Sequence, residues 1–234
     1  MSDAPIRCVL FDLDGTLVDT APDLGRAANH VRATLGLAPL PLADYRVVAS
    51  AGARGLLGKA LGITPEHADF DVHRRVFLDH YRAHLADASR PFAGVNDLLT
   101  AIEAAGRSWG VMTNKPAWLT APLLEALGLA ARARCVVSAD EVPRAKPAPD
   151  GLLRAAALAG VATSDCIYVG DDLRDIDAAR AAGMFSVAAA WGYIGEAPLE
   201  RWGADLVAAT PGELQRWLAE RPCSEGQGRY TTRP

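Results

Sequence analysis

The sequence predicts an α/β fold: a doubly wound, Rossmann-like parallel sheet core into which a helical cap domain is inserted. Two observations predict it. Short apolar runs alternate with longer amphipathic segments through most of the 234 residues, which is the order expected of strands and helices in a parallel sheet. After the first apolar run, about seventy residues show helical spacing of apolar side chains instead.

The expected strands are continuous apolar runs, as in a sheet that is buried on both faces. They cover residues 8–11, 108–112, 135–138, 166–169 and 185–189, with a weaker candidate at 206–207. The expected helices between them cover residues 94–105, 117–127, 149–159, 174–182 and 212–220. Several of these helices end at a glycine, which is a common helix terminator.

The expected cap consists of helical patterns at residues 23–35, 42–49, 52–61 and 67–86. The core would then comprise residues 1–17 and 90–220, the cap residues 18–89, and the hinges would lie near 18–19 and 90–94. Residues 221–234 are polar, with scattered Pro and Gly, and we expect this tail to be poorly ordered.

Composition excludes several classes of protein. The net charge is −4 and no basic patch stands out, which argues against nucleic acid as a partner. No apolar run is long enough to span a bilayer, and the N-terminus shows no signal-peptide pattern. The four scattered cysteines form no CxxC pair, as expected of a reduced, cytoplasmic protein. The sequence leaves open a monomer or a homodimer.

Polar side chains gather where the expected strands end, which is the edge at which open α/β sheets bind ligands. Asp12 and Asp14 follow the first strand. The other residues of this kind are Thr113, Asn114, Lys146, Asp171, Asp172 and, one turn into the next helix, Asp175.

Several carboxylates at one edge need a cation between them. Oxygen ligands without His or Cys favour a hard ion, most simply Mg²⁺. A lysine such as Lys146 balances a second anion, and the Thr113 hydroxyl can bind phosphate oxygens. Such a set suits phosphoryl transfer, in which a carboxylate can itself be the nucleophile and form an aspartyl-phosphate.

Four segments carry a resemblance to a known family: DLDGT at 12–16, TNK at 113–115, KPAPD at 146–150 and GDDLRD at 170–175. In this order they resemble the haloacid dehalogenase superfamily of phosphatases, over most of the chain up to about residue 220. Within it, the sequence is most similar to the phosphoglycolate phosphatase group. Segments such as WGVMTNKP and VGDDLRDI also resemble the phosphatases of N-acetylmuramic acid 6-phosphate.

The resemblance implies roles for these residues. Asp12 would be the nucleophile and a Mg²⁺ ligand, and Asp14 the general acid/base, with its main-chain carbonyl on the metal. Thr113, Asn114 and Lys146 would bind the substrate phosphate. Asp171 would be the third protein ligand of Mg²⁺, while Asp172 and Asp175 compete for a supporting role, with Asp172 open to the simpler interpretation of a helix N-cap.

The implied activity is Mg²⁺-dependent hydrolysis of a small carboxylated phosphate ester, 2-phosphoglycolate or N-acetylmuramic acid 6-phosphate. Asp14 favours an ester over a halide, because only an alkoxide leaving group needs a proton. In the cap, Arg54 is a candidate for binding the substrate carboxylate, or else an outward-facing packing residue. Lys59 raises the weaker alternative of the Schiff-base lysine of related phosphonatases.

Two other functions stay open from the sequence. One is a phosphosugar mutase of the same superfamily, which shares the core. The other, from a different class, is a phospho-receiver regulatory domain, which also combines acids, a Thr and a Lys on a doubly wound sheet. A receiver lacks a helical insert after its first strand, which argues against that interpretation.

Overall fold

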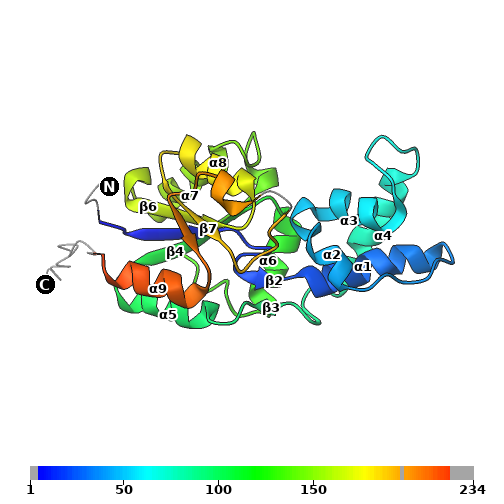
Figure 1. Cartoon of the computed structure of the whole chain (residues 1–234), viewed down its shortest axis with the longest axis horizontal. Helices are drawn as coiled ribbons and strands as arrows, with labels where there is room; N and C mark the ends of the chain where they lie inside the picture. The colour runs from blue at the N-terminus through cyan, green and yellow to red at the C-terminus, as the bar shows by residue number, and fades with distance from the viewer. Residues whose placement is uncertain (1–4, 196–197, 222–234) are drawn as a thin grey trace, which may run out of the picture.

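A computed structural model describes residues 5–195 and 198–221. Its centre is a six-stranded sheet, all of whose paired strands are parallel, in the order β5–β4–β1–β6–β7–β8 (Figure 1). The strands are β1 (Cys8–Phe11), β4 (Ser108–Thr113), β5 (Val136–Ser138), β6 (Cys166–Gly170), β7 (Phe185–Ala189) and β8 (Leu206–Ala208). The predicted doubly wound sheet is therefore confirmed, each strand lying within a residue of its expected bounds.

Helices cover both faces of this sheet. They are α5 (Val95–Ala104), α6 (Ala117–Ala126), α7 (Asp150–Ala159), α8 (Leu173–Ala181) and α9 (Pro211–Ala219). In Figure 1, α5 and α9 lie below the sheet, and α7 and α8 lie above it. The predicted helices are all present, and Gly160, with φ of 72°, ends α7 in the left-handed conformation that glycine tolerates best.

Strand β1, near the centre of the sheet, shows why the strands are continuous apolar runs in the sequence. Cys8 and Leu10 pack into a cluster with residues of α7 and α8, whereas Val9 and Phe11 point to the opposite face and a cluster with residues of α5 and α9. All four side chains are fully buried. Because successive side chains of a strand alternate between faces, a sheet covered on both sides requires an apolar residue at every position.

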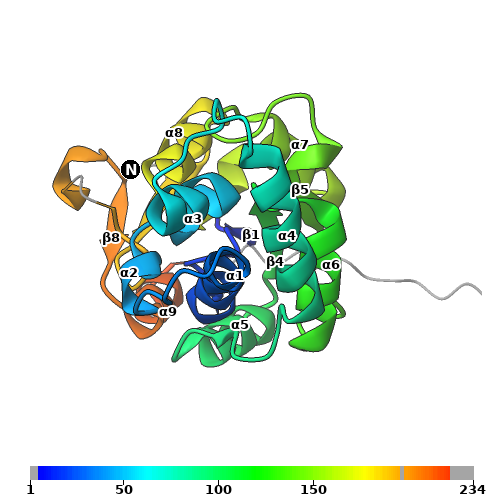
Figure 2. The same cartoon turned by 90° about the vertical axis from the view of Figure 1, so that its right-hand side faces the viewer.

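Between β1 and β4 the chain leaves the sheet for a helical segment, residues 18–91, which we call the helical insertion. It contains β2 (Val18–Asp19), α1 (Ala21–Thr34), α2 (Ala43–Arg46), α3 (Gly52–Leu61), α4 (Phe70–Ala83) and β3 (Arg90–Pro91). Figure 2 shows α1 to α4 in front of one end of the sheet. The expected helices are present, while the division of the chain into a core and a cap domain stays a prediction.

The helix predicted at 42–49 is shorter in the structure, where α2 covers only Ala43–Arg46. Continuous α-helix ends at Arg46, and a 3₁₀ turn at Ala49–Ala51 leads into Gly52. Gly52 has φ of 58° and ψ of −150°, a conformation outside the helical region. The helix expected at 67–86 is also shorter and covers Phe70–Ala83.

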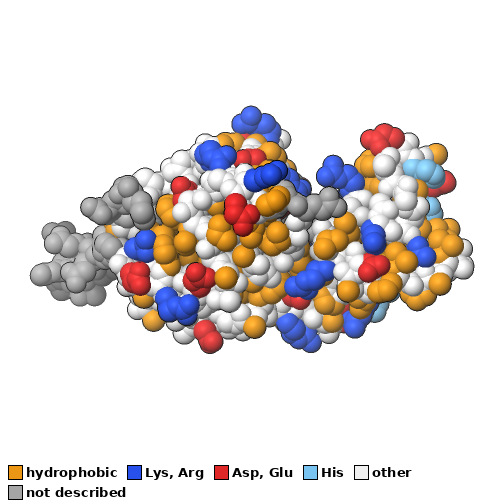
Figure 3. All heavy atoms as spheres, in the orientation of Figure 1, with side chains coloured by type: hydrophobic (Ala, Val, Ile, Leu, Met, Phe, Trp, Pro, Cys, Tyr) orange, Lys and Arg blue, Asp and Glu red, His pale blue; other side chains and the backbone are white. Residues whose placement is uncertain are grey.

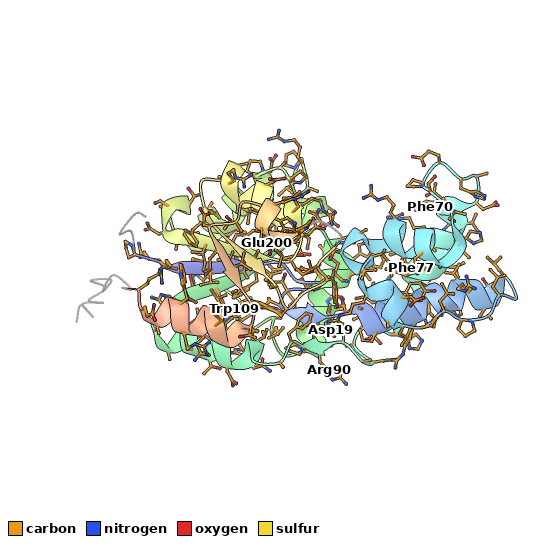
Figure 4. The ribbon with its side chains drawn as sticks, viewed as in Figure 1. Asp19, Phe70, Phe77, Arg90, Trp109 and Glu200 are labelled. Atoms are coloured by element: carbon orange, nitrogen blue, oxygen red, sulfur yellow. The ribbon has the colours of Figure 1, made fainter. Side chains whose placement is uncertain are left out.

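The two crossings between sheet and insertion lie side by side. β2 and β3 pair antiparallel with Asp19 opposite Arg90, and both residues lie at the junction of the two parts in Figure 4. Beside this pair, the buried Asp23 carboxylate accepts hydrogen bonds from Ala88 N at 2.9 Å, and from Ser89 N and Oγ, both at 2.7 Å. These contacts tie the segment that enters the insertion to the segment that leaves it.

Charged side chains of both signs are interspersed on the face drawn in Figure 3. Among the described residues, none of the helices combines the length and the apolar character needed to cross a membrane. Residues 222–234, most of the predicted tail, lie outside the described part of the chain.

Asp23→Ala should destabilise the protein, because it leaves the buried donors of Ala88 and Ser89 without an acceptor. We expect the free energy of unfolding in urea to fall by about 3 kcal/mol. Asp97→Ala, which removes an exposed carboxylate from the first turn of α5, should cost less than about 1 kcal/mol. Equal losses of unfolding free energy in the two variants would contradict the proposal that Asp23 holds the entering and leaving segments of the insertion together.

Candidate active site

The carboxyl end of β1 places two acids at the sheet edge. Asp12 follows the strand directly, and its N–H donates to Val169 O on β6 at 2.9 Å. The chain then turns at Gly15, which has φ of 93°, and a Cβ at this position would overlap the Asp171 carboxylate. Glycine is therefore required here for both its conformation and its size. As a result Asp12 and Asp14 both face one cavity.

Three buried carboxylates converge at this edge. Oxygens of Asp12, Asp171 and Asp175 lie within 4.8 Å of one another. Asp12 is 8% exposed, and the other two are 1% exposed. The Lys146 ammonium lies between two of them, 2.8 Å from Asp12 Oδ1 and 2.7 Å from Asp175 Oδ1, and also donates to the Tyr168 hydroxyl at 2.8 Å. Within this cluster of three acids, Lys146 therefore pairs with Asp12 and Asp175.

The charges of this cluster are not balanced by protein groups alone. Burial, together with Asp12 and Asp175, raises the pKa of Asp171 well above its ordinary value. Burial raises the pKa of Asp175 to about 6, although Lys146 opposes the shift. Burial opposes the charge on Lys146, but Asp12 and Asp175 outweigh it and raise its pKa to about 12.

These residues fit a hard cation. The donor set consists of carboxylate oxygens only, which favours an ion such as Mg²⁺ over a soft metal. Asp12 Oδ1 is buried and, among the described residues, accepts no well-aligned hydrogen bond, although it touches the Lys146 ammonium. An added positive charge would lower the cost of ionising Asp171 and Asp175.

Asp171 is oriented from two sides. Thr16 Oγ1 donates to Oδ1 at 2.8 Å, and Tyr193 N donates to Oδ2 at 2.9 Å. Ser50 Oγ, from the helical insertion, donates to the same Oδ2 at 3.2 Å. The insertion therefore reaches one acid of the cluster directly.

The structure separates the two acids that the sequence left in competition. Asp172 caps α8: its carboxylate accepts from Arg174 N at 2.9 Å and pairs with the Arg174 guanidinium at 2.8 Å. Asp175 completes this capping box, because its Oδ2 accepts from Asp172 N at 3.0 Å, and it also joins the acidic cluster. The N-cap interpretation of Asp172 is confirmed, and Asp175 is the acid beside Lys146.

Thr113 and Asn114, at the end of β4, both line the cavity. The Asn114 amide, however, is hydrogen-bonded to the main chain of Lys146: Oδ1 accepts from Lys146 N at 3.0 Å, and Nδ2 donates to Lys146 O at 3.2 Å. Asn114 thus holds the loop that carries Lys146. The Thr113 hydroxyl accepts from Lys115 N at 3.2 Å and keeps its own proton available.

Lys115 is the residue that sequence reasoning missed. Its ammonium contacts both carboxylate oxygens of Asp14, at 3.0 and 3.1 Å, and donates to the Tyr81 hydroxyl at 2.9 Å. Thr20 Oγ1 also donates to Asp14, at 2.7 Å. A signal was present in the sequence, because Lys115 is one of only three lysines and directly follows Thr113 and Asn114.

A cavity of about 280 Å³ separates the sheet edge from the insertion. Its floor carries Asp12, Asp14 and Lys146, and the insertion contributes Arg54 and Arg74 together with apolar side chains such as Phe77 of α4 (Figure 4). Lys59 lies outside the lining, and its ammonium is 3.8 Å from Asp44 instead. This position does not suit the Schiff-base alternative.

Comparisons with known proteins agree with this geometry. An N-acetylmuramic acid 6-phosphate phosphatase of Pseudomonas aeruginosa is 43% identical over 210 residues, covering 89% of this chain and 93% of the relative. A phosphoglycolate phosphatase of Xylella fastidiosa is 42% identical over 226 residues, covering 92% and 94%. The crystal structure of a predicted phosphoglycolate phosphatase from Haemophilus somnus superposes with a TM-score of 0.81 at 26% identity, covering 93% and 99%.

A family model matches residues 6–183, which include all four motifs at the sheet edge. This span is also where the acidic cluster, Lys146 and the helical insertion lie. A receiver domain is thereby excluded. The chain belongs to the haloacid dehalogenase-like hydrolases.

Proposed function

We propose that this protein is a Mg²⁺-dependent phosphomonoesterase that acts through an aspartyl-phosphate on a small carboxylated phosphate ester. The observation that carries the proposal is the floor of the cavity, where Asp12 Oδ1 is buried, lacks a well-aligned donor and lies 2.8 Å from Lys146. A carboxylate in this position is suited to attack a phosphorus atom whose oxygens are bound by the neighbouring cation.

The carboxylates of Asp12 and Asp171 and the main-chain carbonyl of Asp14 would hold Mg²⁺, with Asp175 supporting the site through Lys146. Bound there, the ion supplies positive charge for the transferring phosphoryl group. Lys146 supplies charge from the other side, and the Thr113 hydroxyl donates a hydrogen bond to a phosphoryl oxygen. Asn114 holds Lys146 in place through its main chain.

The reaction then takes two steps. In the first, a carboxylate oxygen of Asp12 attacks phosphorus, the bond to the ester oxygen breaks, and Asp14 gives that oxygen a proton. In the second, Asp14 takes a proton from water, the water oxygen attacks phosphorus, and the bond to Asp12 breaks. A phosphosugar mutase would share the first step and return the phosphoryl group to a sugar, so product analysis separates the two activities.

Two cavity arginines support a carboxylated substrate. Arg54 and Arg74 both come from the insertion, opposite the acids of the sheet edge. A guanidinium can bind a carboxylate through two parallel hydrogen bonds. The relatives named above act on 2-phosphoglycolate or N-acetylmuramic acid 6-phosphate, and both compounds carry a carboxylate besides the phosphate.

Phosphate release from these two esters tests the proposal directly. We expect turnover of one or both, and Arg54→Ala should raise KM more than it lowers kcat if this side chain binds the carboxylate equally in ground and transition states. Release of phosphate from neither ester, in the presence of Mg²⁺, would contradict the proposed substrate class.

Asp12→Asn should abolish phosphate release, because the amide is a far weaker nucleophile than the carboxylate. We expect kcat to fall by about a thousandfold or more, with a circular dichroism spectrum like that of the wild type. Asp97→Asn, which changes an exposed acid outside the cavity lining, is the matched control and should keep wild-type activity. Substantial activity in Asp12→Asn would refute the role of Asp12.

Mg²⁺ should raise the Tm, and by more at about pH 7.5 than at about pH 5. Asp175 has a pKa raised to about 6 in the folded, metal-free protein, so it holds more protons there than in the unfolded chain as the pH rises from about 4 to about 6, and Asp171, whose pKa is also raised, acts in the same direction. Stability therefore falls through this window and the loss persists above it. A bound cation favours the ionised carboxylates and therefore offsets more of this loss at the higher pH.

Scanning calorimetry with EDTA or with Mg²⁺ at both pH values measures this difference. EDTA should also stop phosphate release, and added Mg²⁺ should restore it. If neither EDTA nor Mg²⁺ changed the Tm or the activity, the proposed metal site would be refuted.

A further inference from the structure

Lys115 is a buried cation to which the steps above assign no part. Its side chain is only 4% exposed. Its ammonium contacts Asp14 Oδ1 and Oδ2 and the Tyr81 hydroxyl, all within 3.1 Å. An ammonium has three N–H donors, so these contacts leave none free for a substrate phosphate or carboxylate. Lys115 therefore acts on the site through its protein partners.

These partners come from separate parts of the chain. Asp14 follows β1 and Lys115 follows β4, whereas Tyr81 lies on α4 in the helical insertion. Tyr81 is 1% exposed, and the Lys115 ammonium lies 4.5 Å from the centre of its ring. A cation over an aromatic face is stabilised further by the ring. The ammonium is thus fixed between the insertion and the acid on the sheet edge.

The charge of Lys115 is secured by this pairing. Burial alone would lower its pKa, but Asp14 and Tyr81 outweigh burial and raise it. Burial raises the pKa of Tyr81 to about 12, so the hydroxyl stays neutral and accepts a hydrogen bond from the ammonium.

We infer that Lys115, held by Tyr81 of the insertion, is a positioning residue for proton transfer by Asp14. The inference rests on the proposed function. When Asp14 gives its proton to the ester oxygen, as the phosphorus–oxygen bond breaks and the bond to Asp12 forms, Asp14 becomes a carboxylate. Lys115 neutralises that carboxylate at about 3 Å and orients it for the water that attacks next.

This role can be tested by comparing esters whose leaving groups differ in their need for a proton. An alkoxide is a poor leaving group and needs the proton from Asp14, whereas 4-nitrophenolate leaves readily without one. Damage to Asp14 or to its positioning should therefore lower kcat/KM, which reports the steps up to departure of the leaving group, much more for an alkyl phosphate than for 4-nitrophenyl phosphate. A purely structural defect lowers the amount of active enzyme and slows both esters equally.

The experiment compares kcat/KM for 2-phosphoglycolate or N-acetylmuramic acid 6-phosphate, whichever the wild type hydrolyses faster, with kcat/KM for 4-nitrophenyl phosphate, because kcat/KM excludes the later water step that both esters share. For Lys115→Met we expect a loss of about a hundredfold on the alkyl ester and less than about tenfold on the aryl ester. Tyr81→Phe keeps the ring but removes the hydroxyl, and should show the same selectivity at about tenfold on the alkyl ester.

Two matched control variants remove the same kinds of side chain, a lysine and a tyrosine hydroxyl, at places outside the contact between Lys115 and Tyr81. Lys59→Met removes a lysine outside the cavity lining, and Tyr45→Phe removes another buried tyrosine hydroxyl of the insertion, which hydrogen-bonds to Asn29 instead. Both should keep the wild-type ratio of kcat/KM for the alkyl ester to kcat/KM for the aryl ester. Tyr81→Phe keeps the experiment decisive if Lys115→Met does not fold.

Equal losses on the two esters, or an unchanged alkyl rate in Tyr81→Phe, would overturn the inference while leaving the phosphatase assignment intact. A wild-type enzyme that releases phosphate from neither class of ester would overturn the proposed function, and the inference with it.

Discussion

The buried excess of negative charge at the carboxyl edge of the sheet is the constraint on which the site depends. Asp12, Asp171 and Asp175 approach within 4.8 Å of one another, and Lys146 contacts two of them. Burying carboxylates costs free energy unless positive charge lies close by. The sheet order β5–β4–β1–β6 sets this geometry, because β4 and β6 are the direct neighbours of β1 and deliver their terminal residues to the same place. A cluster of this kind fits a cation, which is the basis of the function proposed above.

The helical insertion does more than cover this edge. Ser50 donates to Asp171 in the acidic cluster, and Tyr81 accepts from Lys115, which contacts Asp14. Both acid positions are therefore in contact with the insertion, directly or through one residue. Such contacts make the arrangement of the proposed catalytic groups depend on where the insertion lies, which is a physical route by which substrate binding in the cavity can influence the proposed chemistry at its floor.

Much of this was predictable from local sequence. Strands buried on both faces need apolar runs, and polar residues that follow such runs in a parallel sheet must meet at one edge. Contacts between side chains from distant segments were not predictable. Asn114 was expected to bind phosphate, but its amide is paired with the Lys146 main chain, and Lys115 received no role because its partner Tyr81 lies 34 residues away on another element. The short β2–β3 pair is likewise too brief to show any periodicity.

The most direct test of this account is to find the phosphoryl group on the enzyme. The protein would be mixed with Mg²⁺ and the better of the two alkyl esters, quenched in acid during turnover, digested and examined by mass spectrometry. The account predicts a peptide that spans β1 and carries one phosphoryl group on Asp12, absent from Asp12→Asn. Turnover without any covalent phosphate on the protein, or with the phosphoryl group on another residue, would contradict it.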